Sequence, residues 1–145
     1  MKRSLLILLL ASLTACASSH TPSAPEKTAG LLKTWWRAEV IEGTRVGFMP
    51  GQKNDVYIIL YSSLRMVGSG GCNHINASYS RSSGAIRFGA VSSTRMVCFP
   101  AVLSRERAFI GAIRKVETFA IDGYRLRMYD HAGREVLRFL AVNRQ

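Results

Sequence analysis

The sequence lacks the residue patterns that most often form metal or catalytic sites. Its three cysteines form no CxxC pair, and His20, His74 and His131 form no HxxxH pair, so the usual spacings of a zinc site are absent. The sequence also contains no GxSxG, no HExxH, no phosphate-binding loop and no dinucleotide fingerprint. We therefore predict that the protein binds no metal and no cofactor and is not an enzyme.

A hydrophobic run long enough to cross a membrane, about 20 residues, is also missing. The short apolar stretch at 5–10 follows two basic residues and precedes Leu-Thr-Ala-Cys at 13–16, which is the shape of a secretory signal peptide over 1–15. Its ending resembles a bacterial lipobox, which implies that Cys16 becomes the lipidated first residue of the mature chain. The alternatives are a secreted protein cut after Ala15, or a cytosolic protein with an apolar first helix.

Lipidation of Cys16 predicts a stable membrane anchor, because several acyl chains such as palmitate hold a protein far better than one chain. Ala17 stands where an aspartate would resemble an inner-membrane retention signal, so we expect an outer-membrane lipoprotein that faces the periplasm. Residues 16–30 are rich in serine, threonine and proline and predict a flexible tether after the lipidated cysteine. A single domain then spans 31–145.

Acidic residues are scarce, with nine Asp and Glu against 20 Lys and Arg. Lys2 and Arg3 leave with the predicted signal peptide, so 18 basic residues remain against nine acidic ones and the mature chain carries +9. Such a charge favours contact with anions. Because the leader directs the chain out of the cytosol and no RNA-binding module is present, we exclude nucleic acid. We expect anionic envelope components or an envelope protein as partners.

Cys72 and Cys98 remain once Cys16 is lipidated, and an even pair in an oxidising compartment predicts a disulfide. The loop from 72 to 98 contains 27 residues counting both cysteines, and closing it stabilises the fold by about 3.5 kcal/mol in the chain-entropy model. Two reduced, buried thiols are the alternative.

Segments of β-forming residues bounded by turn residues predict a mainly β fold. The predicted strands cover residues 34–41, 56–61, 64–67, 85–88, 118–121, 124–129 and 136–142. About seven such strands form a small antiparallel, barrel-like meander. One helix, with Pro100 in its first turn and Lys115 near its end, should pack across the sheet because its apolar residues form a single stripe.

Glu106 interrupts this stripe, between Val102 and Phe109. Helical geometry places its carboxylate among apolar neighbours, and a buried charge needs partners. We expect these partners to be Arg95 or backbone amides of the loop 92–98. A general acid or base is the alternative interpretation, although no second carboxylate or nucleophile stands in a fixed relation to Glu106.

The last predicted hairpin turns at residues 130–133. If Tyr129 faces Arg134, then the alternation of a strand places one set of residues toward the core and another toward solvent. The predicted core set is Tyr124, Leu126, Leu137 and Phe139, and the predicted outer set is Arg125, Arg127, Arg134 and Arg138, with Arg125 opposite Arg138. Such an outer face either binds an anion or is screened by water.

Several motifs together resemble the META/HslJ family of small bacterial envelope proteins. The residues that carry the resemblance are Gly70-Gly71-Cys72-Asn73, Tyr79, Ile86-Arg87-Phe88-Gly89, Ser93-Thr94-Arg95-Met96-Val97-Cys98, Glu106, Phe109, Gly123, Leu126 and Asp130. The resemblance extends over 31–140. It implies a compact antiparallel barrel-like domain with a helix, usually in a lipoprotein or secreted protein. Some members are associated with heat-shock induction, novobiocin resistance or motility, and no enzymatic activity is established for the family.

Carried onto this sequence, the resemblance implies a structural motif of polar and apolar residues close to the two cysteines. Its members are Gly71, Asn73, Thr94, Arg95, Met96, Glu106 and Phe109. The sequence departs from the family pattern at His74 and Ile75, directly after Asn73. We expect a lipid-anchored, non-enzymatic envelope protein that acts in envelope maintenance or in stress and antibiotic tolerance through binding. The alternatives are a barrel that binds an apolar drug or lipid, and a hydrolase that uses Glu106 or His74.

Overall fold

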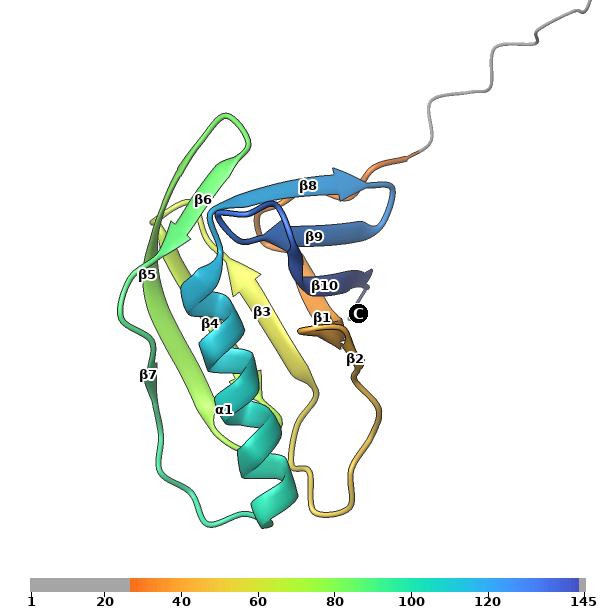
Figure 1. Ribbon diagram of the computed structural model, residues 1–145, viewed down its shortest axis with the longest axis vertical. Helices are drawn as coiled ribbons and strands as arrows, with labels where there is room; N and C mark the ends of the chain where they lie inside the picture. The colour runs from red at the N-terminus through yellow and green to blue at the C-terminus, as the bar shows by residue number, and fades with distance from the viewer. Residues whose placement is uncertain (1–26, 144–145) are drawn as a thin grey trace, which may run out of the picture.

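The computed structural model describes residues 27–143 of the protein (Figure 1). The predicted signal peptide, Cys16 and most of the predicted tether therefore lie outside the described residues. Ala29 already belongs to the domain, because its backbone N–H donates to the carbonyl of Gly123 at 2.9 Å. Between residues 27 and 143, no helix combines the length and the apolar character that a membrane span requires.

Ten strands and one helix are present within residues 27–143. The elements, in chain order, are β1 (Trp35–Ile41), β2 (Thr44–Arg45), β3 (Val56–Leu60), β4 (Arg65–Gly70), β5 (His74–Ser82), β6 (Ala85–Phe88), β7 (Ser92–Ser93), α1 (Pro100–Lys115), β8 (Thr118–Asp122), β9 (Arg125–Tyr129) and β10 (Glu135–Val142).

The strands form a closed antiparallel barrel. Neighbours follow the order β10-β9-β8-β6-β5-β4-β3-β1, and β1 pairs back onto β10 to complete the circle of eight strands. The short strands β2 and β7 add to β1 and β5 respectively. The weakest junction is between β6 and β8, which pair only at Ala85 and Thr118. The prediction of a mainly β, barrel-like fold with one helix is confirmed.

The longest strand of the barrel, β5, is not among the predicted strands. Ile75, Ala77 and Tyr79 are buried, and the polar residues between them are exposed, so the strand has the alternation of a half-buried sheet. This alternation was the sequence signal for the strand. The strand β4 is also longer than expected, because it continues through Gly68, where an added Cβ would lie 2.1 Å from the carbonyl oxygen of Tyr57.

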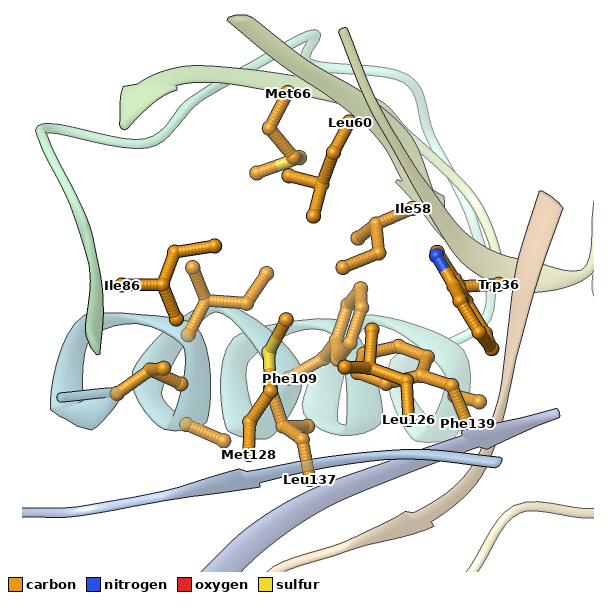
Figure 2. Packing of buried hydrophobic residues seen from close by; sticks show 14 of the residues in the cluster. Trp36, Ile58, Leu60, Met66, Ile86, Phe109, Leu126, Met128, Leu137 and Phe139 are labelled. Carbon is orange, nitrogen blue, oxygen red and sulfur yellow. The ribbon is translucent and has the colours of Figure 1, made fainter. Parts of the chain in front are cut away.

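The helix α1 packs against the barrel and contributes to its core. It lies against β4, β10, β1 and β6, and its buried residues are Val102, Glu106, Phe109, Ala112 and Ile113. Figure 2 shows Phe109 directed into the space between the two groups of strands, close to Leu126 and Phe139. The rings of Phe109 and Phe139 meet edge to face with centroids 6.2 Å apart. The barrel interior is therefore filled by side chains.

Trp35 and Trp36 point to opposite sides of β1, as neighbouring strand residues do. Trp36 is fully buried and donates from Nε1 to the carbonyl of Leu31 at 3.0 Å. Trp35 lies on the outer side and stacks on Tyr57 with ring centroids 3.5 Å apart. The outer indole thus covers a neighbouring strand of the same barrel.

The predicted register of the last hairpin is wrong by one residue at Tyr129, which faces Glu135, and by two residues along the rest of the hairpin. Arg138 faces Arg127, and Leu140 faces Arg125. The second residue of the shift comes from a bulge between Glu135 and Leu137, which inserts one extra residue so that Val136 and Leu137 are both buried. Tyr124, expected in the core, lies before β9 and is 49% exposed.

Candidate functional site

The motif residues meet at the end of β4, where Asn73 and Glu106 form a buried polar pair. Glu106 is 5% exposed and Asn73 is 3% exposed. One carboxylate oxygen of Glu106 accepts a hydrogen bond from the backbone N–H of Asn73 at 2.8 Å, and the other accepts from its side-chain Nδ2 at 2.7 Å. The buried carboxylate is therefore compensated by two charge-assisted hydrogen bonds.

Asn73 also holds the segment that leads into the helix. Its Oδ1 accepts hydrogen bonds from the hydroxyl of Thr94 at 2.9 Å and from the backbone N–H of Met96 at 2.7 Å. The hydroxyl of Thr94 in turn accepts from the backbone N–H of His74 at 3.2 Å. One asparagine thus joins the start of β5, the 94–96 segment and the helix.

A disulfide between Cys72 and Cys98 lies next to this network, with Cα atoms 6.3 Å apart. Cys72 is completely buried, and Cys98 is partly exposed. Because Cys72 precedes Asn73 and Cys98 follows Met96, the disulfide and the hydrogen bonds of Asn73 fasten the same two segments.

Two glycines let the helix approach the end of β4. A Cβ on Gly70 would lie 2.3 Å from Cγ of Glu106, which is closer than side chains tolerate. A Cβ on Gly71 would lie 2.9 Å from a guanidinium nitrogen of Arg105, and Gly71 also has a φ of +103°. The pair of glycines therefore provides the room in which Arg105 and Glu106 sit, and Gly71 provides a backbone conformation that favours glycine.

The predicted partners of Glu106 are wrong. Arg95 is exposed, and both carboxylate oxygens accept from Asn73 rather than from amides of the 92–98 loop. The network reaches that loop only through the asparagine side chain. Spacing along the sequence could not reveal this contact, because Asn73 and Glu106 are 33 residues apart.

The network links chain segments and includes no hydroxyl paired with a base. The Thr94 hydroxyl donates to Asn73, and the side chain of His74 is exposed. Within residues 27–143, no group of three or more His, Cys, Asp or Glu residues is arranged to hold a metal ion. This geometry can fix one end of the helix to the barrel.

The family model of the META domain matches residues 29–143. The chain belongs to the META domain family. The resemblance seen in the motifs is thus confirmed, and the Asn73–Glu106 network with its disulfide lies within the matched residues.

Two solved structures have a similar fold. One is described as the NMR structure of the protein from Burkholderia xenovorans, with 21% identity and a TM-score of 0.62 over 90% of this chain and 100% of that one. The other, described as the NMR structure of the protein, has 18% identity and a TM-score of 0.57 over 74% of this chain and 88% of that one. At these identities the likeness concerns the fold. No curated protein matches the chain.

The four arginines of the predicted anion-binding face all have carboxylate partners. The ion pairs are Arg125–Glu39 at 3.3 Å, Arg127–Glu135 at 3.7 Å, Arg134–Asp130 at 2.7 Å and Arg138–Glu135 at 2.6 Å. The like charges that face each other across β9 and β10 are therefore compensated inside the META domain. An anionic partner has to compete with these carboxylates.

Asp130 is the most strongly engaged of these carboxylates. It is buried and accepts hydrogen bonds from the backbone N–H groups of Ala132 and Arg134 and from the Arg134 guanidinium. The pKa of Asp130 is lowered, first by the backbone hydrogen bond from Arg134 and then by its side chain. The sequence signal for this role was present, because an aspartate at the start of a turn commonly accepts from the amides that follow it.

Proposed function

We propose that this META-domain protein is a lipid-anchored component of the bacterial cell envelope that acts by binding and not by catalysis. Its role is envelope maintenance or tolerance of stress and antibiotics. The outer membrane is the proposed location, with the domain held in the periplasm by the tether after Cys16.

Two features of the sequence and the fold support this location. The segment 13–16 has the character of a lipobox, and the Cys72–Cys98 disulfide suits an oxidising compartment. A lipidated Cys16 and a disulfide between the other two cysteines would use all three cysteines of the chain.

The observation that argues against catalysis is the pairing of Glu106 with Asn73. A general acid or base has to reach a substrate proton within hydrogen-bond distance, but Glu106 is buried and engaged on both oxygens. The hydrolase alternative is therefore the weaker one. Core side chains fill the barrel interior, so an apolar drug or lipid has to bind at the surface of the domain.

The anchor is tested by feeding cells a clickable palmitate analogue. The wild type should incorporate the label, and the Cys16→Ser variant should lose it and accumulate as precursor or as soluble protein. A wild-type mature chain whose mass shows no acyl group contradicts the anchor.

The binding role is tested by crosslinking intact envelopes, purifying the lipidated protein and identifying the molecules crosslinked to it. We expect specific envelope components to co-purify with the wild type and to be absent from the same preparation of the Cys16→Ser variant. A deletion strain should survive heat and antibiotics less well than the parent, and the wild-type protein should restore its survival. Multiple-turnover hydrolysis that disappears in the folded Glu106→Gln variant contradicts a non-catalytic role.

A further inference from the structure

An apolar groove of ≈ 420 Å³ lies between the helix α1 and the segment around β2. Ala101, Ser104 and Ala108 line it from the helix, and Val46 and Met49 line it from the segment after β2. Ala101 and Ala108 are exposed, so their small side chains leave the groove open to solvent. Its volume is within the range of about 300–1,000 Å³ that is typical of small-molecule sites.

Arg105 lines this groove without an anionic partner among residues 27–143. Its guanidinium donates to the carbonyl of Gly47 and to Oε1 of Gln52, each at 2.6 Å, and both acceptors are neutral. Its buried Nε has no hydrogen-bond acceptor in the described part of the chain. Burial lowers the pKa of Arg105, because the charge leaves water without an anion beside it.

The other charges of the groove leave this positive charge uncompensated. Arg45 also lines the groove and forms no ion pair with the carboxylates of residues 27–143. Glu42 also lines the groove but is paired with Lys115 at 3.0 Å. By contrast, Arg125 and Arg138 on the barrel surface each have a carboxylate partner.

We propose that this groove binds an anionic amphiphile with one apolar chain, with the chain along the alanine-lined wall and the head group at Arg105 and Arg45. An apolar chain gains by leaving water, and an anion offsets the desolvation of the guanidinium and accepts charge-assisted hydrogen bonds. A free fatty acid and a monoacyl phospholipid share this chemistry. The inference gives a ligand class to the proposed binding role and rests on it.

Isothermal titration with dodecanoate below its micelle concentration tests the proposal. The protein is the chain from residue 17, which retains the whole described fold. Dodecanoate should bind in a 1:1 ratio and about tenfold more tightly than dodecanol, since the anion adds a charge-assisted hydrogen bond. A second arm with monoacyl phosphatidylglycerol identifies the source of the ligand, because the better-bound amphiphile carries the preferred head group.

Two tryptophan variants locate the site. Ala108→Trp should fill the groove and weaken dodecanoate binding by at least about tenfold. Ala120→Trp, on an exposed position of β8 outside the groove, is the matched control and should bind as the wild type does. Arg45→Gln, which removes an exposed charge without touching the contacts of Arg105, should reduce the preference for dodecanoate over dodecanol.

Three results overturn the proposal: no binding of either amphiphile to the folded chain, equal binding of dodecanoate and dodecanol, or unchanged binding in a folded Ala108→Trp variant. None of these results changes the outcome of the palmitate labelling or of the envelope crosslinking, which test the proposed function. Failure of the ligand proposal for the groove is therefore distinguishable from failure of the proposed function.

Discussion

Asn73 donates two hydrogen bonds to Glu106, one from its backbone N–H at 2.8 Å and one from its side chain at 2.7 Å. The same side chain accepts from Thr94 and Met96. The helix, the start of β5 and the segment between them thus depend on one residue pair. Changes to this pair or to its close neighbours should therefore alter the stability of the whole domain.

Glu106→Ala should lower the free energy of unfolding by about 3 kcal/mol, because it removes two charge-assisted hydrogen bonds and leaves buried donors of Asn73 without an acceptor. Urea denaturation measures the loss. Arg107→Ala, on the exposed side of the same helix, is the control and should change the stability by less than about 0.5 kcal/mol. Equal effects of the two substitutions would falsify the structural role of Glu106.

Gly70→Ala should destabilise the domain by about 1–3 kcal/mol, because the new Cβ would overlap Glu106 at 2.3 Å. Gly111→Ala is a matched glycine substitution, inside α1, and apart from the local helix backbone and the chain neighbours nothing lies within 4 Å of the added Cβ. It should stabilise the domain by about 0.5–1 kcal/mol, since alanine is the better helix former. Thermal melts of both variants measure these effects, and a harmless Gly70→Ala shows that the helix can move away from β4.

Removal of the disulfide in a Cys72→Ala, Cys98→Ala double variant should cost about 3.5 kcal/mol for the loop from 72 to 98. Adding a reductant to the wild type should lower its melting temperature toward that of the variant. Peptide mapping without reductant should recover Cys72 and Cys98 in one linked pair of peptides. Recovery of both residues as free thiols in protein taken directly from the envelope contradicts the prediction.

The stability of the domain should fall in acid partly through Asp130. Its pKa in the folded protein is below the ordinary value of 3.8, so its stabilising contribution is complete above that value and is lost as the pH falls through the folded pKa. The stability difference between the wild type and Asp130→Asn should therefore be constant near neutral pH and shrink below about pH 4. Arg134→Gln, which keeps the backbone donors, should show a smaller difference of the same sign. A difference that grows in acid rejects this assignment.

Much of the architecture is predictable from local patterns. Pro100 marks the start of the helix and Asp122-Gly123 marks a hairpin, because these residues restrict the backbone wherever they occur. The periodicity of α1 also places Glu106 on the apolar stripe, in agreement with its burial. A carboxylate on such a stripe indicates a partner inside the protein, because a buried charge without one is unstable.

Long-range pairing decided what local patterns could not. The partner of Glu106 is Asn73 and not Arg95, because the barrel brings the end of β4 under the helix. The bulge near Val136 shifted the register of β9 and β10, and a single inserted residue changes which arginines face each other.

The sequence by itself therefore determined the segments, the buried faces and the family motifs of this META domain. Only the tertiary structure decided the closure of β1 onto β10, the hydrogen bonds of Asn73, and the position of Arg105 beside an apolar groove. The physical reason is that periodicity reports which side of an element avoids water. The identity of each contact depends on strand pairings between residues far apart in the chain.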